Sequence, residues 1–258
     1  GFTLGSDAFV NGSSNQFAAW AWDAGTSTVS NTDGSITSQV KANPSAGFSI
    51  VSYTGSGANS TIGHGLNAAP EFIITKNRDS GSFNWGVYHA AAGNTVYLKL
   101  NTIDAAATQA TWQNTTPTSS IFYVGNYNSA NQSADDYIAY CFAPVEGYSS
   151  FGKFTANAST DGPFVYLGFR PALVVCKKSS NSSIWIALDS ERDPNNVTTN
   201  FLRWNDTDAE ASTADRMDFL SNGFKLRAPG GYSPNETNGD TYIYLAFAEH
   251  PFKTARAR

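Results

Sequence analysis

Apolar and polar residues alternate in short runs along the chain, and glycine, asparagine, aspartate and proline separate the runs. The run "DYIAYCFA", which starts at Asp136, carries apolar residues on both parities, as is typical of a strand buried on both faces. Similar runs start at Gln16 ("QFAAWAW") and Thr241 ("TYIYLAFA"). Turn residues recur at intervals of about ten residues, which predicts an all-β chain of short antiparallel strands.

The chain contains an internal repeat. Shifted by 101 positions, residues 53–76 align with 154–177 without a gap, so that Tyr53 meets Phe154 and Pro70 meets Pro171. Trp85 then meets Trp185, one residue out of step. A fixed period of this length indicates repeated structural units. The sequence therefore predicts two copies of one unit of about 100 residues.

A third copy is partial. "GFTLG" (1–5) matches "IFYVG" (121–125), and "QFAAWAW" matches "DYIAYCF" at the same shift. Residues 1–23 are therefore predicted to form the last hairpin of a preceding unit, and we expect the natural polypeptide to extend upstream. Residues 25–46 are an insertion whose "NTDG" predicts an added hairpin, or a linker that pairs as an edge strand.

The predicted fold is two tandem antiparallel β-sandwiches, jelly-roll-like, preceded by the partial-repeat hairpin. The predicted domains are 1–46 (hairpin and insertion), 47–147 (repeat 1) and 148–258 (repeat 2). The short join "PVEG" favours a fixed angle between the repeats. Residues 102–111 and 207–217 are the only helix-like stretches, each able to form one or two turns or a loop. The strands of repeat 1 are expected near 48–54, 62–66, 71–77, 84–90, 95–101, 110–113, 120–125 and 136–143.

Composition excludes some classes of partner. Charged residues are 14% of the chain and aromatic residues another 14%, with a formal net charge of −5. Lysine and arginine do not cluster except in the terminal "KTARAR", which argues against nucleic acid as a partner. No apolar run approaches the length of a membrane span, so membrane insertion is not expected.

The residues that could carry cofactor or metal chemistry are scattered. Cys141 and Cys176 each lie in an apolar strand pattern and are interpreted as buried, reduced thiols. The three histidines, His64, His89 and His250, do not recur at equivalent positions and fit no zinc spacing. Aspartates in turns could hold calcium through oxygen ligands, but no matching loop motif supports this. No cofactor, metal or catalytic residue is predicted.

Carboxylates and aromatic residues define the candidate sites. Glycosidases need only two carboxylates, and the densest cluster, "DSERDP" (189–194), is interpreted as a solvated turn. The loops joining the last two strands of each copy, 5–16, 125–136 and 227–241, differ in sequence between flanking strands that repeat. An aromatic ring among amides and carboxylates suits a sugar, although simple solvated turns remain the alternative. The predicted ligand-binding residues are Phe9, Tyr127 and Tyr232 at these tips, and Trp112 in the loop-like "ATWQN".

Several segments resemble a known family. "TIGHGLNAAPEFIITKNR", "YIAYCFAPVEGYSSFGKF", "DGPFVYLGFRPALVVCKKS" and "YLAFAEHPFK" are similar to repeated modules of tail and fibre-like virion proteins of tailed bacteriophages, especially those of aquatic hosts. The resemblance covers nearly all of the chain. It implies a virion location, other virion proteins as partners and, by family analogy, a homo-oligomer, commonly a trimer. It supplies no catalytic residues.

The sequence therefore predicts a non-enzymatic virion protein of the tail, fibre or appendage that adheres to host-surface glycan or presents an adhesin. Two alternatives stay open. One is a carbohydrate-binding module of a secreted polysaccharide-active enzyme, and the other is a tailspike-type glycan depolymerase with paired carboxylates.

Overall fold

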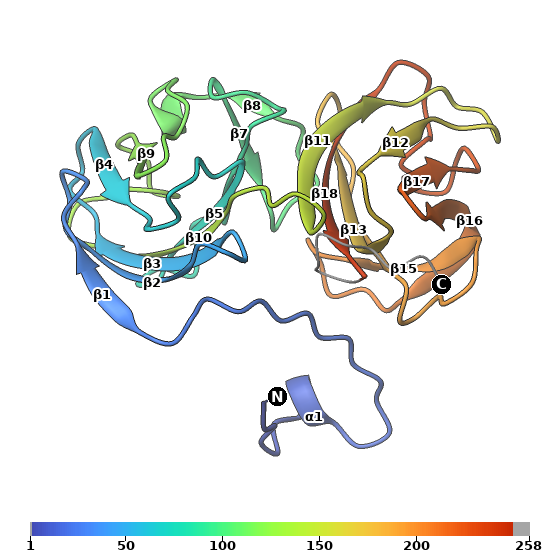
Figure 1. Ribbon diagram of the computed structural model, residues 1–258, viewed down its shortest axis with the longest axis horizontal. Coiled ribbons are helices and arrows are strands. Elements are labelled where there is room, and N and C mark those ends of the chain that lie inside the picture. The colour runs from blue at the N-terminus through green and yellow to red at the C-terminus, as the bar shows by residue number, and fades with distance from the viewer. Residues whose placement is uncertain (1, 250–258) are drawn as a thin grey trace.

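The computed structural model describes residues 2–249, without the side chains of residues 213 and 215. The chain is nearly all β and folds into two antiparallel units side by side (Figure 1). Unit one is built on residues 28–142 and unit two on residues 149–248. The predicted all-β class and the two antiparallel β-sandwich units are confirmed. His250 lies outside the described residues.

The elements of unit one have the following bounds: β1 Thr28–Asn31, β2 Ser38–Asn43, β3 Phe48–Thr54, β4 Ser60–Gly63, β5 Phe72–Asn77, β6 Gly86–His89, β7 Val96–Lys99, β8 Ala107–Thr108, the 3-10 turn η1 Ala110–Trp112, β9 Ile121–Val124 and β10 Asp136–Phe142. Those of unit two are β11 Ser149–Thr155, β12 Phe164–Tyr166, β13 Pro171–Lys178, β14 Trp185–Asp189, β15 Thr198–Arg203, β16 Ala211–Leu220, β17 Gly223–Leu226 and β18 Thr241–Ala248. A short helix, α1 (Ala8–Asn11), precedes both units.

The two units share one strand topology. In unit one the main sheet has the order β1-β2-β3-β10-β5-β6-β7-β8, and β4 pairs with β9 in a separate ribbon. In unit two the order is β11-β18-β13-β14-β15-β16-β17-β12, so the equivalent ribbon β12–β17 joins the sheet through β16. The strands β3 and β11 lie 101 residues apart along their whole length, as the repeat predicts.

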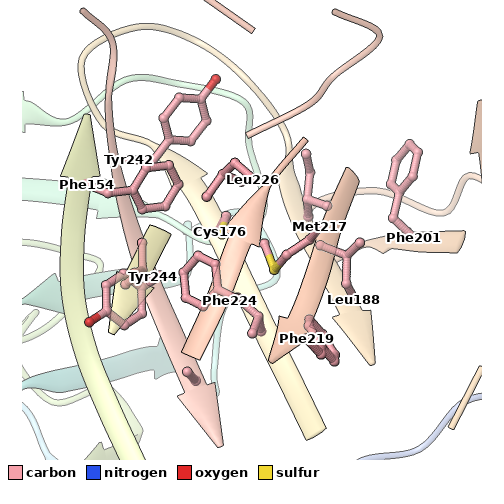
Figure 2. Packing of buried hydrophobic residues seen from close by; sticks show 14 of the residues in the cluster. Phe154, Cys176, Leu188, Phe201, Met217, Phe219, Phe224, Leu226, Tyr242 and Tyr244 are labelled. Carbon is pink, nitrogen blue, oxygen red and sulfur yellow. The ribbon is translucent and has the colours of Figure 1, made fainter. Parts of the chain in front are cut away.

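The cores of the two units repeat as well. Tyr53 stacks on Tyr137 with ring centroids 5.4 Å apart, and Phe154 stacks on Tyr242 at the same distance. The pair in unit two lies at one end of a cluster that includes Met217 (Figure 2). Aromatic pairs facing each other across neighbouring strands stabilise a sheet by up to about 1 kcal/mol each.

The insertion forms the predicted hairpin. β1 and β2 pair antiparallel, and β2 adds to the outer edge of β3 through Gln39 to Asn43. The inward side chains of β2, Ser38 and Val40, are buried, whereas Gln39 faces solvent. This alternation is what keeps a half-buried edge strand in register.

The prediction of a hairpin over residues 1–23 is wrong. Residues 2–27 contain no strand, and α1 buries none of its residues. The N-terminal trace that contains this segment instead crosses below both units toward β1 (Figure 1). Trp22 packs against the apolar cluster that the two units share. A two-stranded hairpin without further strands to cover its apolar face is not stable in water.

Two local predictions in the repeats are also wrong. Residues 110–113 form the 3-10 turn η1 instead of a strand, and Gln113 and Asn114 that follow it have left-handed φ angles of 53° and 51°. Residues 211–217 of the second helix-like stretch belong to strand β16, which pairs with β15 and β17. A strand position between two neighbouring strands overrides the helix propensity of the two alanines within residues 211–217.

The two units share a third apolar cluster, here called the seam. It combines Phe48, Phe72 and Phe142 of unit one with Phe151, Trp185 and Phe247 of unit two. Trp22 contacts Phe142 and Phe247, with ring centroids 5.7 and 5.3 Å away, and thus bridges the units. Because the seam is apolar and continuous with both sheets, it fixes the units relative to each other.

Polar groups also cross the seam. Trp185 Nε1 donates to the carbonyl of Lys99 at 2.9 Å, and His89 Nε2 donates to the carbonyl of Tyr244 at 3.1 Å. The buried Lys177 Nζ donates to the carbonyl of Ile103 at 3.2 Å, and its burial lowers the pKa of the ammonium group to about 8. Each bond satisfies a carbonyl that the other unit removes from water.

Candidate functional site

A buried asparagine anchors each of the loops that join the last two strands of a unit. In unit one, the buried Asn131 accepts from Ser56 N at 2.8 Å and donates to Ala58 O at 2.5 Å. In unit two, the buried Asn235 makes the same two bonds, with Asn157 N at 2.9 Å and Ser159 O at 2.6 Å. The loops therefore repeat in "SAN" (129–131) and "SPN" (233–235), contrary to the prediction that only their flanking strands repeat.

Replacing Asn131 by alanine is expected to lower the free energy of unfolding by about 2 kcal/mol, because the part-buried bonds to Ser56 N and Ala58 O are lost and the buried amide leaves a gap. Asn235→Ala is expected to have an effect of similar size, because its bonds are the same. Urea denaturation of both variants measures this. A large loss at one position and none at the other would contradict the equivalence of the two loops.

A polar hollow opens beside the tip loop of unit one. It has a volume of about 360 Å³, within the size range of small-ligand sites. Its walls are the η1 turn, the β3–β4 loop and the start of the 125–136 loop. We call it the amide hollow, because side-chain amides dominate its lining residues: Asn59, Ala110, Gln113, Asn114, Asn126 and Tyr127.

Local backbone geometry holds the walls of the amide hollow in place. Gln113 Nε2 donates to the carbonyls of Ser60 and Val124, at 2.8 and 2.9 Å, and thereby ties η1 to both strands of the β4–β9 ribbon. A Cβ on Gly125 would lie 2.6 Å from Ala110 O and 3.3 Å from the ring of Tyr127. The glycine thus allows the turn and the tyrosine to come together.

Three amides of the hollow are available to a ligand. The side chains of Asn59, Asn114 and Asn126 are exposed, and within residues 2–249 they have no hydrogen-bond partner. Each offers one acceptor and two donors, and the half-buried ring of Tyr127 lies beside them. Donors, acceptors and an aromatic face at one open site are the groups that bind a polyhydroxylated ring.

The structure separates the four residues predicted to bind a ligand. Tyr127 lines the amide hollow, whereas Phe9 lies on α1, exposed and outside both units. Tyr232 is exposed on unit two, with the guanidinium carbon of Arg203 5.1 Å from the centre of its ring. This cation already occupies one face of the ring.

Trp112 is a core residue, and its assignment to a binding surface is wrong. Only 2% of its surface is exposed, and its ring packs edge-on against Tyr88 with centroids 5.8 Å apart. The polar neighbours in "ATWQN" predict a loop, but the 3-10 turn directs Thr111 and Trp112 inward. Trp112 itself does not line the amide hollow, although the next two residues in the chain do.

Both aspartates of the 189–194 cluster, and Asp218 of β16, have structural partners. Asp189 accepts from Arg192 Nε at 2.7 Å, and Asp218 pairs with Arg227. Asp193 accepts from the backbone N–H groups of Thr199 and Asn200, which ties down the 189–200 connection. No carboxylate is among the residues that line the amide hollow.

The thiols and histidines of the described residues are buried. Burial raises the pKa of Cys141 to about 12, because the thiolate would be desolvated. It lowers the pKa of His64, whose Nε2 donates to the carbonyl of Thr118 at 3.1 Å. Within residues 2–249, no three His, Cys, Asp or Glu side chains lie close enough together to hold a metal ion.

No helix among the described residues has the length and apolar character needed to cross a membrane. The fold and the hollow define a protein of two antiparallel β-sandwich units with an amide-lined surface site. A family profile described as "Domain of unknown function (DUF7483)" matches residues 1–251, so the chain belongs to the DUF7483 family. No curated protein and no solved structure gives a significant match to the chain.

Proposed function

We propose that the chain is a non-enzymatic module of a bacteriophage tail or appendage and that its amide hollow binds a host-surface glycan. The observation that carries the binding role is the ring of Tyr127 beside three side-chain amides that have no partner in residues 2–249. Glycan recognition uses this combination, since the ring contacts C–H groups and the amides bond hydroxyls. The virion location rests on the sequence resemblance to tail and fibre modules.

The rigid seam supports a structural role for the same module. An appendage that presents a binding site must hold that site in a fixed orientation. Two units joined by an apolar cluster do not swing freely, so the seam meets this requirement. The structural partners of Asp189, Asp193 and Asp218 favour a non-catalytic module over a glycan depolymerase. A carbohydrate-binding module of a secreted enzyme is the second candidate, because the same hollow chemistry serves it equally well.

The proposal is tested with an array that carries bacterial surface polysaccharides beside plant, algal and chitin-type polysaccharides. Binding to a bacterial surface glycan, with no shortening of that glycan in mass spectra after prolonged incubation, is the expected result. Binding confined to the other polysaccharides favours the secreted carbohydrate-binding module. Cleavage of the bound glycan favours the depolymerase. Absence of binding to every class removes the adhesion role and leaves a structural module.

A further inference from the structure

The ribbons β4–β9 and β12–β17 are equivalent, but only one of them has its outer edge covered. Ile62 faces Phe122 in the first ribbon, and Val165 faces Phe224 in the second. "IFYVG" (121–125) aligns with "GFKLR" (223–227), so Phe122 and Phe224 are equivalent and their partners Ile62 and Val165 are equivalent too. Thr61 therefore corresponds to Phe164 and Gly63 to Tyr166. This register differs by two residues from the gapless sequence alignment and keeps each side chain on the same face.

In unit one the inserted hairpin closes the outer edge of β4. Ile36 N donates to Thr61 O at 3.1 Å, and Thr61 N donates to Ser35 Oγ at 2.9 Å. Ser38 Oγ donates to Gly63 O at 3.0 Å. The backbone groups of Thr61 and Gly63 that point away from β9 are therefore largely satisfied.

Unit two has no inserted hairpin, and β12 is the last strand of its sheet. Leu226 N donates to Pro163 O, and Leu167 N donates to Asn222 O. The backbone N–H and C=O groups of the odd-numbered residue of β12, Val165, therefore point toward β17. In an antiparallel pair the backbone N–H and C=O groups of the alternate residues point away from the partner strand. The backbone groups of Phe164 and Tyr166 therefore line a free edge, and no hydrogen bond to them occurs within residues 2–249.

The side chains at this edge do not permit the covering found in unit one. A Cβ on Gly63 would overlap Asn31 Oδ1 of the hairpin, whereas the equivalent residue in unit two is Tyr166. Phe164 and Tyr166 are 46% and 69% exposed. An unpaired strand edge with two exposed aromatic rings is a template for pairing with another strand.

The chain itself contains a strand-like segment that pairs with no strand among the described residues; its one bond is Gly5 O accepting from Asn11 Nδ2 at 2.7 Å. Residues 2–4, "FTL", match "FKL" (224–226) of β17, which already pairs with one edge of β12. Phe2 and Leu4 are 66% and 45% exposed, and residues 2–5 form no ladder. Val10 and Phe17 farther along are also exposed, so the apolar residues of 2–17 have little cover within their own chain.

We propose that residues 2–5 of a second copy of this chain add to the free edge of β12 as an antiparallel strand. Phe2 and Leu4 of that copy then pack beside Phe164 and Tyr166, and the outward backbone groups of β12 gain partners. Two copies that exchange their segments reciprocally form a closed dimer, and one-way exchange extends into a chain of subunits. This interaction is independent of glycan binding at the amide hollow.

Sedimentation equilibrium of the full chain tests the proposal over a wide range of protein concentration. The wild type is expected to self-associate. The first variant, Tyr166→Pro, removes an outward N–H of β12 and leaves its pairing with β17 intact. The second is the double variant Phe2→Ser with Leu4→Ser, which changes only exposed residues. Both variants are expected to weaken association at least tenfold. The control Val29→Ser, an exposed apolar residue of β1, is expected to associate like the wild type.

A mixture of the two weakened variants is the decisive arm. One retains the acceptor edge and the other retains the donor segment, so the mixture is expected to form heterodimers although neither variant associates alone. Circular dichroism and thermal melting establish that both are folded. A wild type that stays monomeric at every concentration, or association unaffected by either variant, overturns the proposal. A monomer that loses glycan binding upon Tyr166→Pro would assign the edge to a glycan and also overturn it.

Discussion

Trp185→Ala is expected to lower the free energy of unfolding by about 4 kcal/mol or more. The side chain is fully buried in the seam, and removing a buried tryptophan costs about 3–5 kcal/mol in lost burial and cavity formation. The substitution also deletes the part-buried bond from Nε1 to the carbonyl of Lys99, which loses this donor. That adds about 1–3 kcal/mol.

Trp85→Ala is the matched control. Trp85 occupies the equivalent position in unit one, and its backbone N–H bonds Asn101 Oδ1 as that of Trp185 bonds Asn205 Oδ1. Its ring is only half-buried, so less than half of the loss is expected. Urea denaturation at neutral pH measures both variants. Trp85 also packs against the seam, so equal losses would contradict only the difference in burial between the two rings. A loss below about 1 kcal/mol for Trp185→Ala would mean that the seam does not stabilise the protein.

Acid is expected to destabilise the protein through His89. Its Nδ1 accepts from Ala91 N at 3.2 Å, its Nε2 donates to Tyr244 O at 3.1 Å, and the ring of Phe72 lies edge-on against it. The ring is therefore neutral, and burial lowers its pKa from 6.5 to about 4. Protonation requires a hydrogen on Nδ1, which conflicts with the N–H of Ala91.

The direction of the pH dependence follows from this depressed pKa. Above pH 6.5 the histidine is neutral in both the folded and the unfolded chain, and its contribution to stability is complete. As the pH falls from 6.5 to 4, only the unfolded chain binds the proton, and stability falls by about 3 kcal/mol. His64 contributes in the same direction.

His89→Gln isolates this effect, because glutamine retains an N–H donor for Tyr244 O and does not titrate. The free energy of unfolding of both proteins is measured in urea at pH 7 and at pH 4. The variant is expected to lose about 3 kcal/mol less than the wild type over this interval. Identical losses in the two proteins would show that His89 is not buried as a neutral ring.

The sequence determines the repeated framework but not the segments whose structure depends on distant neighbours. The alternation of side chains places β3 and β11 at their observed bounds, and "NTDG" locates the hairpin of β1 and β2. The course of residues 2–27 depends on the seam, which no local pattern encodes. The burial of Trp112 depends on a 3-10 turn that is followed by the left-handed residues Gln113 and Asn114, and the polar neighbours in "ATWQN" do not predict this turn.

The candidate site was predictable in part. Tyr127 follows from a tip loop between repeated strands, and it does line the amide hollow. The other walls come from η1 and from Asn59 in the β3–β4 loop, which lie far from Tyr127 in sequence and meet it only through the fold. A comparison of "SAN" with "SPN" would have revealed the clamps of Asn131 and Asn235 beforehand.

Isothermal titration calorimetry with a glycan selected on the array tests most directly whether the amide hollow is the binding site. Tyr127→Ala removes the aromatic face and is expected to raise the dissociation constant at least tenfold, which corresponds to about 1.4 kcal/mol. Tyr232→Ala, which removes an exposed tyrosine of unit two, is expected to bind like the wild type. Unchanged affinity in a folded Tyr127→Ala protein, or a loss confined to Tyr232→Ala, would contradict binding at the amide hollow.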